Sequence, residues 1–210
     1  MIHILIVDDH AVVRDGVKRL VDEQLGAAVF GEASTAQEAL QLVREAHWHV
    51  VVLDIALGER NGLDVLKELQ QLRPKLPVLI LSMHAEDQYA RRAFKAGAAG
   101  YITKDSSRVE LVTAMNKVIN GGKYISPMLA ETLVVDMVRG TDNPLHEALS
   151  DREFEVRCLI ASGKTVSQIA EWLSLSDKTI STYRARILEK MRMKTNAELT
   201  HYAMQNKLVN

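Results

Sequence analysis

Cysteine is almost absent from this chain of 210 residues, which contains Cys158 alone. A single cysteine excludes an internal disulfide and fits a reducing compartment. No apolar run approaches the roughly 18–20 residues that a membrane helix needs. Residues 1–9 have no basic lead and end in two acids, which argues against a signal peptide. We therefore expect a cytoplasmic protein without a membrane segment.

The chain also lacks a strong excess of either charge, since 26 Lys and Arg stand against 27 Asp and Glu. The balance shifts along the sequence: residues 1–122 contain 14 basic and 16 acidic residues, and residues 149–210 contain 10 and 7. A mildly basic C-terminal part is a weak sign of nucleic-acid binding. No glycine-rich nucleotide-binding loop follows any predicted strand, which counts against the alternative of a nucleotide- or flavin-using enzyme.

Apolar strand-like runs alternate with helical patterns through the first 122 residues. The runs cover residues 3–7, 28–31, 50–54, 78–82 and 100–104. Apolar residues recur at helical spacing over residues 11–24, 35–46, 62–72, 86–96 and 109–119. This alternation predicts an α/β fold, a doubly wound five-stranded parallel sheet with helices on both faces.

Asp54 ends the most apolar of these runs, Val50-Val51-Val52-Leu53. A strand buried on both faces has no obvious use for a carboxylate, because an unpaired buried charge is unfavourable. The carboxyl ends of parallel strands border the binding crevice of such folds. Taken alone, Asp54 is more often a cap or turn residue, so the assignment depends on its neighbours.

Other polar residues share this position at the carboxyl ends of the predicted strands. They are Asp8, Asp9, Ser82 and Lys104. Each has an ordinary explanation as a cap, a turn residue or a solvated side chain, but their convergence favours a functional site. Clustered carboxylates repel one another unless a cation joins them, and oxygen ligands suit Mg²⁺. The ammonium of Lys104 and the hydroxyl of Ser82 suit phosphate oxygens.

This set, with the segment Ala98-Ala99-Gly100-Tyr101-Ile102-Thr103-Lys104, resembles the receiver domain of bacterial two-component response regulators. The resemblance implies a flavodoxin-like fold with strand order 2-1-3-4-5. It implies that Asp54 accepts a phosphoryl group from a sensor histidine kinase, with Mg²⁺ as cofactor. The implied metal ligands are Asp8, Asp9, Asp54 and the backbone carbonyl of Ala56.

The same resemblance implies that Ser82 and Lys104 contact the bound phosphoryl group. It makes Tyr101 a switch residue, although a packed aromatic explains this position equally well. The sequence departs from the family pattern at Ala56-Leu57-Gly58-Glu59, where Met-Pro-Gly is frequent, and at Asp105, where proline is frequent. We expect this protein to differ from its relatives in the loop that contains Leu57, Gly58 and Glu59.

The pattern changes in residues 123–148, which we interpret as a linker that contains a helix. Ser126 is a plausible N-cap for a helix from Pro127 to Val138. Residues 140–144 have the composition of a flexible connection. The predicted domain limits are therefore 1–122, 123–148 and 149–210.

Residues 149–210 are predicted to form a small all-α domain. Ser150 and Glu153 make a capping-box pattern, and further helices are expected over about 166–173, 178–191 and 195–206. Two helices joined by a short turn, the second with basic residues on its outer face, describe a helix-turn-helix. The predicted packed side consists of Ile169, Ala170, Leu173, Leu175, Ile180, Ile187 and Met191.

The order of motifs from Leu149 to Ser181 resembles the LuxR/NarL-type DNA-binding domain, so the whole chain resembles a NarL/FixJ response regulator. The resemblance implies that the helix from Lys178 enters the major groove. The implied DNA contacts are Lys178, Thr179, Ser181, Thr182, Arg184, Ala185, Arg186 and Lys190. Alanine cannot donate a hydrogen bond to a base, so Arg184 would take more of the base reading than Ala185. The last helix resembles a dimerisation helix, and core packing is the alternative.

We therefore predict a phosphorylation-controlled transcription regulator, not an enzyme, that binds a twofold DNA operator as a homodimer. A solvated basic face remains an alternative for the outer side of the helix-turn-helix. A second alternative is output through a partner protein, with weak DNA binding. The weak charge excess and Ala185 keep it open.

Overall fold

The computed structural model describes residues 1–58, 60–84, 86–131, 134, 145–206 and 208. Its contacts divide the chain into two compact units, Met1–Glu131 and Thr132–Asn210, which are described separately. Among the described residues, no helix is long and apolar enough to cross a membrane.

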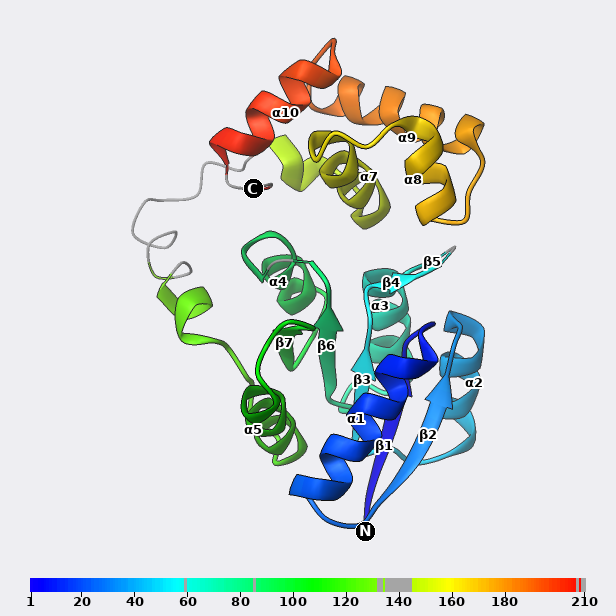
Figure 1. The fold of residues 1–210 in the computed structure, drawn as a ribbon, viewed down its shortest axis with the longest axis vertical. Coiled ribbons are helices and arrows are strands. Elements are labelled where there is room, and N and C mark those ends of the chain that lie inside the picture. The colour runs from blue at the N-terminus through cyan, green and yellow to red at the C-terminus, as the bar shows by residue number, and fades with distance from the viewer. Residues whose placement is uncertain (59, 85, 132–133, 135–144, 207, 209–210) are drawn as a thin grey trace. The chain divides into compact units, whose positions relative to one another are not determined.

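A parallel sheet forms the centre of the first unit (Figure 1). Its strands are β1 (Ile2–Val7), β2 (Ala28–Ala33), β3 (Val50–Leu53), β6 (Val78–Ser82) and β7 (Gly100–Thr103). They lie in the order β2-β1-β3-β6-β7, and each neighbouring pair is parallel. Numbered within this sheet, the order is 2-1-3-4-5, so the predicted topology is confirmed.

Helices cover both faces of the sheet. They are α1 (Ala11–Gln24), α2 (Ala36–Glu45), α3 (Gly62–Leu72), α4 (Glu86–Lys95) and α5 (Arg108–Ile119). Helix α1 packs beside α5, and α3 packs beside both α2 and α4 (Figure 1). The side chains of Thr35, Asn61 and Ser107 accept backbone N–H bonds at the starts of α2, α3 and α5, which satisfies donors that a helix leaves unpaired.

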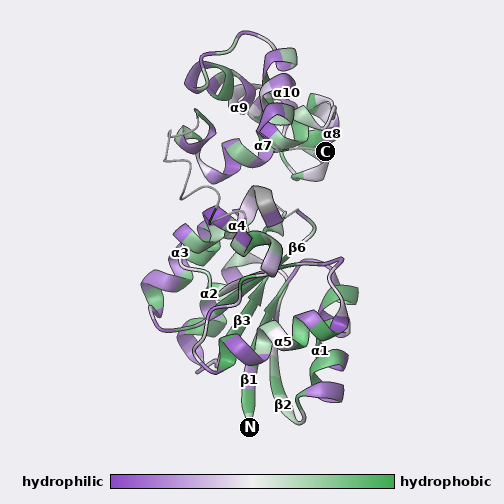
Figure 2. Cartoon of the chain, turned by 90° about the vertical axis from the view of Figure 1, so that its left-hand side faces the viewer, coloured by the Kyte–Doolittle hydropathy of each residue, from purple (hydrophilic) through white to green (hydrophobic). Residues whose placement is uncertain are grey.

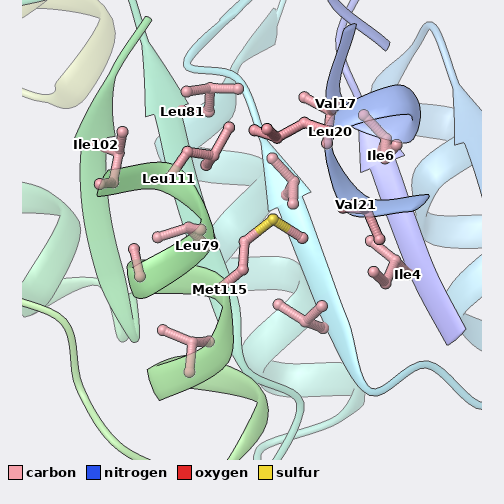
Figure 3. Close-up of a cluster of buried hydrophobic side chains, with 14 of the residues drawn as sticks. Ile4, Ile6, Val17, Leu20, Val21, Leu79, Leu81, Ile102, Leu111 and Met115 are labelled. Carbon is pink, nitrogen blue, oxygen red and sulfur yellow. The ribbon is translucent and has the colours of Figure 1, made fainter. Parts of the chain in front are cut away.

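The core on the α1 and α5 side of the sheet is continuous and apolar (Figure 3). Successive strand residues point to opposite faces, so alternate positions such as Ile4 and Ile6 meet these helices. Both faces are buried because the intervening residues, Leu5 among them, are also fully covered. In Figure 2 the strands are accordingly hydrophobic, whereas the helices carry hydrophilic stretches as well. This sheet fixes the positions of the residues that follow each strand.

Two features of the first unit differ from the sequence-based expectation. The segment after Asp54 was expected to be a loop, but it contains the short antiparallel strands β4 (Ala56–Leu57) and β5 (Arg60–Asn61). In addition, Tyr124 bridges to Gly100 at the edge of the sheet, and Ser126 caps a helical turn over 127–131. Residues 123–131 therefore pack with the first unit, and most of the predicted helix to Val138 lies outside the described residues. The predicted limits at 122 and 148 stay predictions.

The second unit is helical. It contains the 3₁₀ helix η1 (Leu145–Ala148) and the helices α7 (Asp151–Ala161), α8 (Val166–Trp172), α9 (Asp177–Lys190) and α10 (Asn196–Gln205). The predicted capping box of Ser150 and Glu153 is present at the start of α7. Six residues of the predicted packed side are buried and Leu175 is half-buried. Helices α8 and α9 pack together around a short turn and form the predicted helix-turn-helix.

Candidate functional site

Two acidic residues directly follow neighbouring strands of the first unit in sequence. Asp8 follows β1, and its N–H donates to the carbonyl of Ala33 at 3.1 Å; Asp54 follows β3, and its N–H donates to Val7 at 2.9 Å. Their side chains are only 3% and 2% exposed. The sheet thus holds two carboxylates close to each other and away from water, as the strand-end positions predicted.

Lys104 joins these two carboxylates. Its Nζ lies 2.7 Å from Asp8 Oδ2 and 2.7 Å from Asp54 Oδ2, and its side chain is 11% exposed. Its backbone N–H donates to the carbonyl of Ser82 at 2.7 Å, which extends the pairing of β7 with β6. A buried charge pair requires good geometry to offset the loss of hydration, and here one ammonium serves two acids.

The ionisation of Asp54 reflects this environment. Burial raises the pKa of Asp54 to about 6, and the charge of Asp8 acts in the same direction; the hydrogen bond and charge of Lys104 and the N–H of Ala56 oppose the rise. For Lys104, burial acts to lower the pKa, but its bonds to Asp54 and Asp8 prevail and the pKa is raised. Lys104 is therefore cationic near neutral pH, and the pKa of Asp54 lies closer to neutrality than the ordinary value for an aspartate.

A cation would fit at the carboxyl ends of β1 and β3. The ligand atoms of Asp8, Asp9 and His10 lie within 4.8 Å of one another. The Oδ1 atom of Asp54 is buried and, among the described residues, has no hydrogen-bond partner. Exposed Asp9 pairs with His10 Nδ1 at 2.6 Å. A hard cation such as Mg²⁺ prefers carboxylate oxygens as ligands. The site offers such oxygens, including the buried Oδ1 of Asp54.

Ser82 is the last residue of β6, and Tyr101 lies in the neighbouring strand β7. Ser82 is fully buried, and its Oγ accepts the N–H of His84 at 3.2 Å. Tyr101 is fully buried too, and its hydroxyl donates to the carbonyl of His84 at 2.8 Å. The ring of His84 stacks on Tyr89 with 4.3 Å between centroids. Burial, followed by the charge of Lys104, lowers the pKa of His84 to about 4, so this imidazole is neutral.

The backbone after Asp54 has little free space. A Cβ atom at Gly62 would lie 2.2 Å from the carbonyl oxygen of Asp54 and 2.6 Å from the Cα of Ile55. The N–H of Gly62 donates to Ile55 at 2.7 Å, and Asn61 caps α3 through its bond from the Leu63 N–H. The start of α3 therefore supports the acidic residue directly. Ala56 is half-buried in β4, and its predicted role as a carbonyl ligand stays a prediction.

In the second unit, α9 presents most of the predicted DNA-contacting side chains to solvent. Exposed residues are Lys178, Ser181, Thr182, Ala185, Arg186 and Lys190, whereas Thr179 and Arg184 are half-buried. Two of the predicted contacts have partners within the domain. Arg184 Nε donates to Asn196 Oδ1 at 2.6 Å, and Lys190 Nζ pairs with Glu153 Oε2 at 2.6 Å. These two side chains help to join helices as well as facing outward.

Helix α10 is firmly part of the second unit. Leu199 and Ala203 are fully buried, and α10 packs against α7. The hydroxyl of Tyr202 lies 3.0 Å from His146 Nδ1, and burial raises the pKa of Tyr202. Core packing therefore accounts for Leu199 and Ala203 on this face, and a role of α10 in dimerisation stays a prediction.

Sequence reasoning did not find His84, His10 or Arg14 near the acidic residues. The nearest signal was position: His10 directly follows Asp9, and His84 lies two residues beyond the strand-end Ser82. Arg14 lies one helical turn into α1, where a basic residue is usually solvated. Its Nη1 donates to the backbone carbonyl of Asp8 at 2.7 Å. This contact depends on the angle between α1 and β1, which no periodicity reveals.

Comparisons with known proteins match both units. The response regulator receiver domain matches residues 4–116, and the family of bacterial regulatory proteins of the luxR type matches residues 147–203. The response regulator GacA of Pseudomonas protegens is 36% identical over 209 residues, which covers 100% of this chain and 98% of GacA.

Solved structures agree with these matches. A two-component response regulator of the LuxR family from Aurantimonas sp. SI85-9A1 is 38% identical with a TM-score of 0.60, over 65% of this chain and 97% of that one. RcsB from Salmonella enterica serovar Typhimurium, bound to promoter rprA in the presence of the phosphomimetic BeF3⁻, is 22% identical with a TM-score of 0.64. That likeness covers 97% of this chain and 99% of RcsB and concerns the fold.

Proposed function

Because this chain belongs to the NarL/FixJ family of two-component response regulators, with a receiver domain and a LuxR-type DNA-binding domain, we propose that Asp54 accepts a phosphoryl group from a sensor histidine kinase. The observation that carries the proposal is the buried contact of Lys104 with both Asp8 and Asp54. It places a carboxylate oxygen of Asp54, the proposed nucleophile, beside the positive charge of Lys104 at the carboxyl ends of the strands.

The chemistry follows from this arrangement. An oxygen of the Asp54 carboxylate attacks phosphorus, a new O–P bond forms, and the N–P bond to the kinase imidazole breaks with return of the electron pair to nitrogen. The product is an acyl phosphate, which water can later hydrolyse. Lys104 is within reach to balance the added charge, and the hydroxyl of Ser82 is a donor for a phosphoryl oxygen. Catalysis in the chain is limited to its own phosphorylation and dephosphorylation.

Asp8, Asp9 and Asp54 are the residues that would hold Mg²⁺, with the backbone carbonyl of Ala56 as the further ligand that the family pattern suggests. The orphaned Oδ1 of Asp54 and the close Asp8–Asp9 pair support this part of the proposal. When bound, the metal would offset negative charge on the transferring group. Lys104 would then be free to exchange a carboxylate contact for one to the phosphoryl group.

The output of the proposal is DNA binding by α9 in the major groove. The exposed residues Lys178, Ser181, Thr182, Ala185 and Arg186 support it most directly. One short helix reads few base pairs, so we propose a homodimer on a twofold operator, formed or stabilised after phosphorylation in the cytoplasm. RcsB, which shares the fold, has been solved on promoter DNA with a phosphomimetic.

Arg184 and Lys190 have a weaker claim to DNA contact, because they already bind Asn196 and Glu153. The same two bonds favour the alternative of output through a partner protein. They leave fewer free cations for DNA in a domain whose basic excess is already small. Salt-dependent binding separates the two outputs, because a direct DNA reader loses affinity steeply as salt rises.

Trapping of the modified residue tests the phosphoacceptor. The full chain would be incubated with a small acyl-phosphate donor and Mg²⁺, reduced with borohydride, and examined by peptide mass spectrometry. Reduction converts an aspartyl phosphate to the corresponding alcohol, so we expect the mark on Asp54 alone. Asp54→Asn should abolish it, and the matched control Asp105→Asn, on an exposed residue beside Lys104, should retain it. A mark on another residue in the wild-type chain would overturn the assignment.

A further inference from the structure

Arg14 connects the first turn of α1 to two other segments. Its Nη1 donates to the backbone carbonyl of Asp8 at 2.7 Å, and its Nε donates to Glu32 Oε2 at 2.9 Å. Its side chain is 16% exposed, so the contact with Asp8 is largely shielded from water. The planar guanidinium suits this position, because its donors point in fixed directions toward two acceptors at once.

Glu32 anchors the arrangement from the edge strand β2. Its other oxygen accepts a bond from Lys18 Nζ at 2.6 Å, and Lys18 also pairs with Asp15 at 2.8 Å. The bond from Lys18, followed by that from Arg14, lowers the pKa of Glu32, so this carboxylate is charged near neutral pH. Both cations therefore tie α1 to β2, but of the two only Arg14 also bonds to Asp8.

Each polar atom of Asp8 has a directional partner. Its N–H donates to Ala33, its carbonyl accepts from Arg14, its Oδ1 accepts the N–H of His10 at 2.8 Å, and its Oδ2 pairs with Lys104. The bond from Arg14 fixes the peptide between Asp8 and Asp9, the two neighbouring acids. The direction of both carboxylates depends on this peptide, since it sets where each Cα–Cβ bond points.

We infer that Arg14, held by Glu32, is a positioning residue that orients the Asp8–Asp9 pair for a divalent cation. The inference rests on the proposed Mg²⁺ site and adds a support that the ligands alone do not supply. Partners behind metal ligands commonly contribute 10–100-fold to metal affinity. Charge alone predicts the opposite sign, because removing a cation near an acidic site strengthens cation binding by electrostatics.

The test is a calorimetric Mg²⁺ titration of the full chain and three variants. Arg14→Gln removes the charge and the planar guanidinium that reaches Asp8 and Glu32 at once, and Arg14→Lys keeps the charge but loses that planar group. Lys18→Gln is the matched control, since Lys18 shares Glu32 with Arg14 and its ion pairs are with Glu32 and Asp15 rather than Asp8. Thermal unfolding would be followed for every variant, so that loss of folding is recognised.

We expect Arg14→Gln to weaken Mg²⁺ binding by about tenfold and Arg14→Lys to weaken it as well. Lys18→Gln should stay within about twofold of the wild-type affinity. Unchanged or tighter binding by folded Arg14→Gln would overturn the inference, as would an equal loss in Lys18→Gln. If Arg14→Gln does not fold, the folded Arg14→Lys variant decides by the same criteria. A wild-type chain that binds no Mg²⁺ would instead remove the proposed metal site itself.

Discussion

At the scale of single residues, the acidic set shows what a sequence can and cannot reveal. The positions of Asp8, Asp54 and Lys104 at strand ends were enough to predict their proximity, because parallel strands align their carboxyl ends. The sequence did not indicate that one ammonium bridges two carboxylates, or that Oδ1 of Asp54 lacks a partner among the described residues. Those facts depend on side-chain rotamers and on burial from all sides.

The raised pKa of Asp54 makes a prediction about stability. The folded pKa is about 6 and the ordinary value is 3.8, so the folded state holds the proton more strongly than the unfolded state does. Stability should therefore rise as pH falls from about 6 to about 4, and Asp54 is destabilising above that window. Asp54→Asn removes this effect, and we expect it to raise the free energy of unfolding at pH 7 by about 1–3 kcal/mol.

Urea unfolding of the wild type and Asp54→Asn at pH 4.5 and pH 7 measures this effect. The difference between the two proteins should be large at pH 7 and shrink at the lower pH. Carboxylates remote from this site titrate in both proteins, so their contribution cancels in the comparison. A wild-type chain that is as stable as the variant at pH 7 would contradict the assigned cause.

At the scale of elements, local rules located the helices and strands of both units well. Helix α2 begins after Thr35, as its cap pattern predicted, and α1 and α3 match their predicted ranges. The hairpin of β4 and β5 was missed because two-residue strands leave no periodicity. The return of Tyr124 to the sheet edge was missed because its N–H bond to Ala99, at 2.8 Å, is a tertiary contact.

The close contact between Gly62 at the start of α3 and the backbone of Asp54 can be tested by substitution, with Gly16 in α1 as a control. Gly62→Ala would place a methyl group against the Asp54 carbonyl, and we expect a loss of about 1–3 kcal/mol in the free energy of unfolding together with slower phosphorylation. Gly16→Ala is the matched control: beyond the backbone of its own helix, a methyl group at this glycine would meet no atom within 4 Å, so alanine should add about 0.5–1 kcal/mol to the free energy of unfolding.

Denaturant unfolding and the rate of labelling by an acyl phosphate would be measured on both glycine variants. The control should be phosphorylated at the wild-type rate. If Gly62→Ala were as stable and as reactive as the wild type, the close approach of α3 to Asp54 would contribute neither to stability nor to phosphorylation.

At the scale of the whole molecule, the chain combines an acidic sheet edge in one unit with an exposed polar and basic helix in the other. The order of motifs predicted both units and the family, because each unit carries its own local patterns. The fates of individual α9 side chains were less predictable. Arg184 was expected to face bases, and its bond to Asn196, the first residue of α10, is a tertiary contact that helical spacing does not describe.

The central claim is that phosphorylation of Asp54 controls DNA binding. Its most direct test is the affinity of the full chain for an operator selected from random DNA, measured by fluorescence anisotropy at fixed salt, with and without an acyl-phosphate donor and Mg²⁺. The account predicts that the donor strengthens binding by the wild type, within the 5–150-fold range of about 1–3 kcal/mol that is typical of coupled sites, and leaves Asp54→Asn unchanged. An equal response of Asp54→Asn, or no response of a fully phosphorylated wild type, would contradict it.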